Sequence, residues 1–234
     1  MPAAIIVSHG QPSDPGPAQS DLEGFSRHVA SALPGWHISA ATLAKEGALD
    51  AALKTAGPNP LVYPLFMTEG WFTGDNLRNR LRGAPEARIL RPLGVSPAMP
   101  DLAADLLHAV LAARSWDAGR TQLFIAGHGS GRSPNSARDT RAFAEALAAR
   151  ITFAECRVGF VEEPPYLADQ AAGLGAQAIC LPFFAARLGH VIEDIPEALD
   201  ATGFEGVRLD PIGCAPRVAQ IVADALTAEA SLSG

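Results

Sequence analysis

The sequence has few cysteines, no excess of positive charge and no long hydrophobic run, and each shortage excludes a class of protein. Its three cysteines, Cys156, Cys180 and Cys214, have no CxxC spacing, which favours buried small side chains over a thiolate metal site or a disulfide. With 18 basic and 25 acidic residues the net charge is −7, so nucleic acid and anionic membranes are poor partners. No apolar run approaches the ~20 residues of a membrane-spanning helix.

Two nucleotide-binding motifs and a signal peptide are missing as well. Neither a GxGxxG nor a P-loop follows any expected strand, which disfavours a phosphate-ligand enzyme. The N-terminal MPAAIIVSHG lacks the basic stretch and cleavage site of a signal peptide, so we expect a cytoplasmic protein. What remains, 48% hydrophobic and 18% charged residues, is typical of a compact α/β protein.

Short apolar runs alternate with amphipathic segments along the whole chain, which predicts β-α units and parallel sheets. Strands are expected at residues 3–8, 37–43, 61–66, 88–93, 122–126, 157–161, 178–184 and 207–211. Helices are expected from Ser20 or Asp21 to 33 and at 48–56, 75–82, 100–114, 135–150 and 216–230, with shorter ones ending at 173 and starting near 190.

The chain contains an internal repeat. Corresponding residues lie 118 or 119 positions apart: His9–Gly10 and His128–Gly129, Phe25 and Phe143, Pro64 and Pro182, and Pro97 and Pro216. Agreement between separate anchors indicates two similar halves, residues 1–115 and 120–234. We expect each half to form a four-stranded parallel sheet flanked by helices, with an active-site cleft between the halves.

The most informative stretch is residues 181–196, LPFFAARLGHVIEDIP, where a buried strand leads into a loop and then a helix. His190 begins that helix, and Glu193 and Asp194 follow three and four positions later, on the same helical face. His128 also directly follows a strand, where open α/β sheets place their ligands. Two imidazoles at strand ends suggest a divalent metal site or an acid/base pair. The carboxylates of Glu193 and Asp194 could instead have no role beyond a favourable interaction with the dipole of the helix.

The halves differ at this site. At the 118-residue offset His190 corresponds to Phe72, while Glu193 and Asp194 correspond to Asp75 and Asn76. The first half keeps His9 but lacks the second imidazole, so we expect one competent site, built mainly from the second half. His9 is either a relic of the duplication or a residue that faces His128.

These motifs resemble the class II tetrapyrrole chelatases, in particular the sirohydrochlorin cobaltochelatase/ferrochelatase family in its long, two-repeat form. The resemblance rests on GHGSGR at residues 127–132, on His-Gly after the first strand of each half, and on PFFAARLGHVIEDIP. It implies ATP-independent insertion of a divalent metal, Co²⁺ first and Fe²⁺ second, into sirohydrochlorin during cobalamin or sirohaem biosynthesis. It also implies that His128 and His190 bind the metal and accept pyrrole protons.

Several carboxylates could assist the histidines. Glu193 and Asp194 are candidates for passing the metal inward or receiving protons. Glu69, in the loop FMTEGWF of the first half, could supply a metal ligand, although a solvated loop residue explains it equally well. Glu162 and Glu163 also follow a strand but rank lower, because they could simply lead into the next helix.

Sirohydrochlorin carries eight carboxylates, so an acidic protein must concentrate positive charge where it binds this substrate. Arginine pairs well with carboxylates because its fork can bond both oxygens. The backbone amides of the loop that begins at Ser130 could hold an anion, and two aromatic residues could stack on the macrocycle. The expected substrate-binding residues are therefore Arg132, Arg138, Arg187, Ser130, Trp71 and Phe72.

One alternative of a different class is a non-catalytic metal or tetrapyrrole carrier on the same fold. A site of His and carboxylate ligands accepts Co²⁺, Fe²⁺ or Ni²⁺, so the sequence leaves the metal open. We expect no permanently bound cofactor, with the metal as a substrate. The partners expected are a tetrapyrrole and a metal ion, and the chain is either a monomer or a homodimer.

Overall fold

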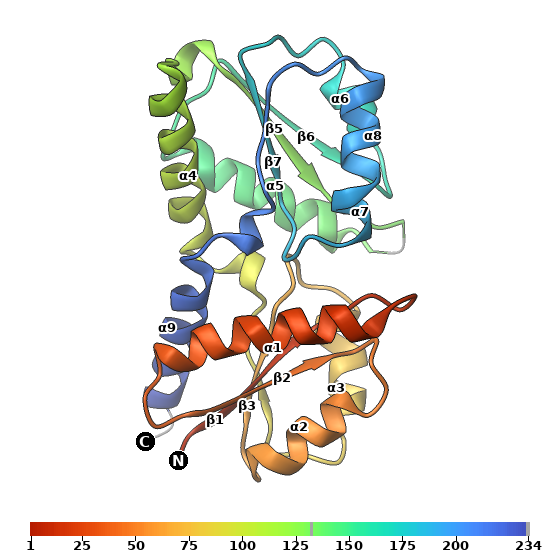
Figure 1. The fold of residues 1–234 in the computed structure, drawn as a ribbon, viewed down its shortest axis with the longest axis vertical. Helices are drawn as coiled ribbons and strands as arrows, with labels where there is room; N and C mark the ends of the chain where they lie inside the picture. The colour runs from red at the N-terminus through yellow and green to blue at the C-terminus, as the bar shows by residue number, and fades with distance from the viewer. Residues whose placement is uncertain (132, 233–234) are drawn as a thin grey trace. The chain divides into compact units, whose positions relative to one another are not determined.

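The computed structural model describes residues 1–131 and 133–232 and contains two four-stranded parallel sheets flanked by helices (Figure 1). The first sheet has the order β2-β1-β3-β4, and the second has the corresponding order β6-β5-β7-β8. This identical order confirms the fold class and the two similar sheets that the repeat predicts. Among the described residues, no helix has the length and hydropathy needed to cross a membrane.

The strands match the apolar runs of the sequence, and the shortest strand of each sheet, β4 or β8, lies at an edge. Central strands β1 and β5 are almost wholly buried, which explains why their sequences are continuously apolar. The first sheet consists of β1 (Ala3–Ser8), β2 (His37–Thr42), β3 (Leu61–Pro64) and β4 (Arg88–Ile89). The second consists of β5 (Gln122–Gly127), β6 (Glu155–Phe160), β7 (Ala178–Pro182) and β8 (Val207–Arg208).

In the first half of the chain, the helices depart from the sequence expectation at two places. Helix α1 begins at Pro15 and not at Ser20 or Asp21, because proline is well suited to a first helical turn. The expected helix at 75–82 is instead a π-helical turn (Phe72–Asn76) followed by the short α3. The helices are α1 (Pro15–Ser31), α2 (Ala48–Ala56), α3 (Leu77–Arg80), α4 (Met99–Arg114), α5 (Asn135–Ala148), α6 (Leu167–Ala171), α7 (Gly189–Ile192), α8 (Asp194–Ala201) and α9 (Val218–Ser231).

The chain folds into two compact units that do not coincide with the halves expected from the repeat. The first unit comprises residues 1–93 and 216–234, and the second comprises residues 94–215. Helix α4 follows β4 in sequence but packs against α5, and helix α9 packs against α1 and β3. Each repeat therefore contributes its last helix to the unit that contains the other repeat's sheet. Hydrophobic periodicity predicts that these segments are helical, but it does not show which elements they pack against.

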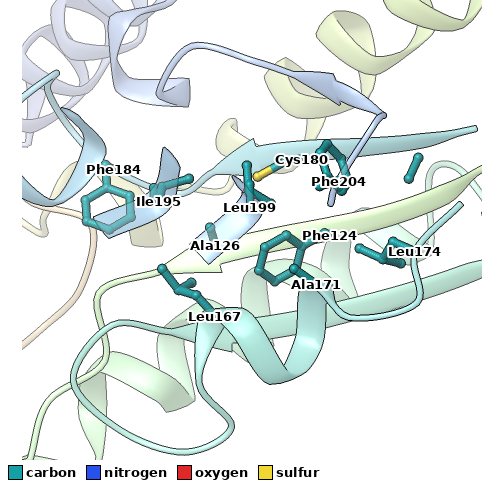
Figure 2. Packing of buried hydrophobic residues seen from close by; sticks show 11 residues of the cluster. Phe124, Ala126, Leu167, Ala171, Leu174, Cys180, Phe184, Ile195, Leu199 and Phe204 are labelled. Carbon is teal, nitrogen blue, oxygen red and sulfur yellow. The ribbon is translucent and has the colours of Figure 1, made fainter. Parts of the chain in front are cut away.

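The second unit has an apolar core between its sheet and two helices (Figure 2). Phe124 from β5 and Cys180 from β7 are fully buried there. Helix α8 contributes Ile195 and Leu199, and α6 contributes Leu167. This packing fixes the start of α8, which is where the chain leaves the short helix α7 that carries His190.

Candidate metal centre

His128 lies directly after β5, with its ring oriented by the neighbouring backbone. Its Nδ1 atom is 2.9 Å from the carbonyl oxygen of Gly129. Because a carbonyl oxygen only accepts hydrogen bonds, Nδ1 carries the hydrogen in the neutral ring, and Nε2 of that tautomer has a free lone pair. Gly129 has a φ of +72°, and a Cβ there would lie 2.8 Å from Cβ of Phe160 and 2.9 Å from Cγ of Glu163. Only glycine fits this turn.

His190 lies on α7, a helix of four residues. Its Nδ1 atom is 2.8 Å from Oδ2 of Asp194, the first residue of α8. A carboxylate oxygen also accepts, so this ring too donates through Nδ1 and leaves Nε2 available. Between the two helices Glu193 adopts φ −110° and ψ −70°, which interrupts the single helix expected here, and its side chain is exposed.

The structure brings the two predicted imidazoles together. Their ring centroids are 4.6 Å apart, and the planes are nearly perpendicular at 88°. The side chains are 44% and 40% exposed, so solvent and a ligand can reach both. Residues from the ends of β5 and of the loop after β7, 62 positions apart in sequence, thus form one accessible site.

A third side chain at this site that could hold a metal ion is Glu162, which follows β6. Its backbone amide donates to the carbonyl oxygen of His128 at 2.9 Å, which holds the loop after β6 against the loop after β5. The potential ligand atoms of His128, Glu162 and His190 all lie within 4.8 Å of one another. Atoms that share a first-row ion lie about 2.1 Å from it, hence up to about 4.2 Å apart, so a small closing movement completes the site.

The sequence ranked Glu162 below Glu69 as a candidate ligand, because the place of Glu162 depends on which strands are neighbours. Strand β6 neighbours β5 in the sheet, so the residues after the two strands meet at the same edge. The strand order was needed to see this, and sequence spacing alone did not supply it. The structure places Glu69 in the first unit, where its Oε1 atom is 3.2 Å from Nε of Arg91.

The first unit contains a counterpart of this arrangement with one imidazole missing. Nδ1 of His9 is 2.9 Å from the carbonyl oxygen of Gly10, as in the contact of His128 with Gly129. The ring of Phe72 meets the ring of His9 edge-on, with centroids 4.5 Å apart and planes at 89°. Phe72 therefore occupies the position that His190 holds in the second unit, as the repeat alignment predicts.

The first unit also has no carboxylate at the position that corresponds to Glu162. The backbone amide of Ala44 donates to the carbonyl oxygen of His9 at 2.9 Å, the same contact that Glu162 makes to His128. Ala44 thus stands where Glu162 stands, with no side-chain oxygen. Two of the three positions therefore carry no ligand atom in the first unit, whereas all three carry one in the second unit.

Comparisons with known proteins bear on the family of this chain. A sequence profile of the CbiX family matches residues 122–229, which include the three metal-binding positions. The solved structure of CbiX, the terminal enzyme for sirohaem biosynthesis in denitrifying bacteria, is 42% identical. The likeness covers 97% of this chain and 99% of that one, with a TM-score of 0.89. The chain belongs to the CbiX family.

The CbiX family is one of the class II chelatases that the sequence resembles, and more distant structures share its fold. SirB from Bacillus subtilis with Fe³⁺ is 18% identical over 100% of this chain and 97% of its own, with a TM-score of 0.74. The sirohydrochlorin chelatase SirB from Bacillus subtilis subspecies spizizenii, in complex with cobalt, is 18% identical over 97% and 94%, with a TM-score of 0.69. No match was found among curated protein sequences.

No cysteine is among the residues that could hold a metal ion in the part of the chain that the structure describes. Cys180 is buried in the core, and burial raises the pKa of its thiol to about 12, so the sulfur stays protonated near neutral pH. The expectation that all three cysteines are buried is wrong for Cys156 and Cys214, which are exposed. The cause is their position: Cys156 lies on the edge strand β6, and Cys214 ends a short 3₁₀ turn.

The residues expected to bind the carboxylates of a tetrapyrrole already have partners within the CbiX fold. Arg138 pairs with Asp139, whose carboxylate is buried, at 2.8 Å, and Arg187 forms an ion pair with Asp210. The amide of Ser130 donates to Oε1 of Glu163 at 2.8 Å. A carboxylate of the substrate must therefore displace these partners or share the same donor with them. Arg132, also expected to bind substrate, lies outside the described residues.

The expected aromatic surface is present in the first unit. Trp71 is 58% exposed, and its ring centroid is 5.0 Å from that of Phe72. The ring of Phe66 is stacked with that of Phe72, with centroids 6.4 Å apart. Exposed aromatic rings in contact with each other provide a surface on which a flat macrocycle can pack.

Proposed function

We propose that this protein inserts a divalent metal into sirohydrochlorin without ATP. The proposal depends above all on one observation: two imidazoles and a carboxylate meet at the carboxyl edge of one sheet, within reach of a single ion. Membership of the CbiX family supports it, as does the relative that works in sirohaem biosynthesis.

The chemistry requires that a divalent ion lose water while the macrocycle loses two pyrrolic protons. One ion enters and two protons leave, so acceptors are needed beside the ion. Nε2 of His128 and of His190 are both available as lone-pair donors, first to the metal and then, as the metal moves to the ring nitrogens, to protons. Glu162 adds a negative charge that favours the incoming cation and receives a proton afterwards.

The type of ligand suits an ion that must be released. Neutral nitrogen and carboxylate ligands hold first-row ions less tightly than thiolates hold them. We therefore treat the metal as a substrate, and the proposed reaction uses no permanently bound cofactor.

Among the metals, we propose Fe²⁺ as the physiological substrate and Co²⁺ as an accepted alternative. The 42% identical relative acts in sirohaem biosynthesis, and sirohaem is an iron compound. Sequence reasoning placed Co²⁺ first, and a site with two nitrogen ligands and one oxygen ligand is able to bind either ion. Relative kcat/KM values for Fe²⁺, Co²⁺ and Ni²⁺, measured anaerobically, distinguish these choices.

Trp71 and Phe72 are proposed to pack on the macrocycle, and Arg138 and Arg187 to exchange their aspartate partners for substrate carboxylates. Removing the Trp71 ring by Trp71→Ala is expected to raise KM for sirohydrochlorin with little change in kcat. Quenching of tryptophan fluorescence by the tetrapyrrole, compared between wild type and this variant, measures the binding directly.

The decisive experiment follows the absorbance change of sirohydrochlorin on metal insertion. His128→Ala and His190→Ala are each expected to lower kcat by about 100-fold or more, because each removes both a ligand and a proton acceptor. His9→Ala is the matched control, since it removes the same His-Gly contact from the first unit. Full activity in either of the first two variants would overturn the proposal. Metal binding with no insertion in the wild type would identify a carrier instead.

A further inference from the structure

We infer that Asp194 is a positioning residue for His190: it holds the imidazole in the tautomer and orientation that present Nε2 to the metal. The inference rests on the proposed function. It replaces the relay role that the sequence suggested for Asp194, because its carboxylate contacts the side of the imidazole that carries Nδ1.

The first argument concerns how His190 is supported. It lies on α7, and a helix of four residues has little stability of its own. Helix α7 ends at Ile192, and Glu193, with φ −110° and ψ −70°, separates it from α8. Helix α8 is anchored, because Ile195 and Leu199 are buried in the core. The bond from His190 to Asp194 therefore connects a weakly supported imidazole to a fixed element.

The second argument comes from the other histidine. His128 donates its Nδ1 hydrogen to a backbone carbonyl, that of Gly129, which is part of a turn that only glycine fits. His190 has a side chain in the equivalent role. A hydrogen bond to Nδ1 determines which nitrogen is free to bind a metal, and such supporting partners contribute strongly to metal affinity.

The third argument is the counterpart in the first unit. Phe72 replaces His190 there, and Asn76 replaces Asp194 at the same 118-residue offset. The Oδ1 atom of Asn76 accepts from Nε of Arg80 at 3.0 Å and so has a local surface role. The carboxylate and the imidazole are absent together. A carboxylate that served only the dipole of the following helix would not need to change with the imidazole.

The test uses Asp194→Asn, Asp194→Leu and Asp194→Glu, with Glu197→Gln as the control. Glu197 is an exposed carboxylate in the first turn of the same helix, so its loss reports any effect on the helix dipole. Circular-dichroism melting establishes that each variant is folded. Asp194→Glu keeps a carboxylate and is expected to restore part of the function lost in Asp194→Leu.

Two measurements need no chelatase activity. In ¹⁵N-histidine NMR spectra, His190 of the wild type is expected as the Nδ1–H tautomer, and Asp194→Leu is expected to give a mixture. Affinity for Co²⁺, measured by calorimetry, is expected to fall about 10- to 100-fold in Asp194→Leu, less in Asp194→Asn, and less than twofold in Glu197→Gln. In the insertion assay kcat falls in parallel, while KM for the tetrapyrrole changes little.

An unchanged tautomer with Co²⁺ affinity within twofold of wild type in Asp194→Leu would overturn the inference. An equal loss in Glu197→Gln would also overturn it, in favour of a dipole effect. If the wild type binds Co²⁺ through His190 but inserts no metal, the proposed function fails while the positioning role stands. If the wild type inserts metal and the Asp194 variants do so equally well, the positioning role fails alone.

Discussion

At the scale of single residues, the site depends on the hydrogen-bond partner of Nδ1 in each histidine. Both rings donate through Nδ1, one to the carbonyl oxygen of Gly129 and the other to the carboxylate of Asp194. The sequence correctly placed His128 directly after a strand and His190 at the start of the helix that follows β7 and its loop. It underrated Glu162, because proximity across neighbouring strands depends on their order in the sheet and not on spacing along the chain.

Replacing Glu162 tests which carboxylate serves the metal. Glu162→Gln keeps the volume of the side chain but removes its charge, so Co²⁺ affinity is expected to fall about tenfold or more, or about 1.4 kcal/mol. Glu69→Gln, which affects an ion pair with Arg91, is expected to have a smaller effect. Calorimetric titration of both variants decides between them. A larger loss in Glu69→Gln would favour the original sequence expectation.

Cys180 predicts a pH dependence of stability. Burial raises its pKa in the folded protein to about 12, from an ordinary value near 9. Above pH 9 the unfolded chain loses this proton while the folded protein keeps it, so the free energy of unfolding falls as pH rises through that range. Urea unfolding of wild type and Cys180→Ala at pH 8 and pH 10 checks this.

The wild type is expected to lose more stability than Cys180→Ala between the two pH values. The comparison must be made as a difference, because burial also raises the pKa of Tyr63, which both proteins contain. Equal losses in the two proteins would contradict the assignment to Cys180.

At the scale of secondary-structure elements, the two sheets were predictable and the ends of several helices were not. Continuous apolar runs identify the central strands because both faces of a parallel sheet are covered. The break between α7 and α8 was missed, since the sequence predicts one helix that starts near residue 190 and Glu193 carries no sequence signal of a kink.

The element-level correspondence between the units predicts that a second metal site can be rebuilt. Ala44→Glu with Phe72→His supplies the missing carboxylate and imidazole beside His9, whose ring is already oriented by Gly10. In a His128→Ala, His190→Ala background, we expect the rebuilt protein to bind one Co²⁺. Each single substitution is expected to bind weakly or not at all.

Calorimetry and the visible spectrum of Co²⁺ measure this binding. Adding Asn76→Asp is expected to strengthen the rebuilt site, because it restores the counterpart of Asp194. Absence of binding in a folded protein with both substitutions would show that the likeness between the units does not extend to metal-binding geometry.

At the scale of the whole molecule, the repeat predicts two sheets but not the exchange of helices. Helix α4 is encoded in the first repeat, yet its apolar face, which includes Leu102, Leu107 and Leu111, is buried in the second unit. Helix α9 belongs to the first unit in the same way. An amphipathic pattern specifies that a helix has a partner, and only the folded chain shows which one.

This exchange predicts how fragments behave. Residues 94–215 contain a complete compact unit with the whole metal centre, so this fragment is expected to unfold cooperatively and to bind Co²⁺. Residues 120–234 lack α4 and carry α9 without its partners, so they are expected to aggregate or to lack a cooperative transition. Circular-dichroism melting of both fragments tests this, and a well-folded 120–234 fragment would contradict it.

The exchanged helices also bear on how such a gene can change over generations. A deletion of the first repeat would remove the unit that lacks two of the three ligand side chains, but it would also remove helix α4, which packs in the second unit. Selection that maintains the site of the second unit would therefore also maintain the first repeat.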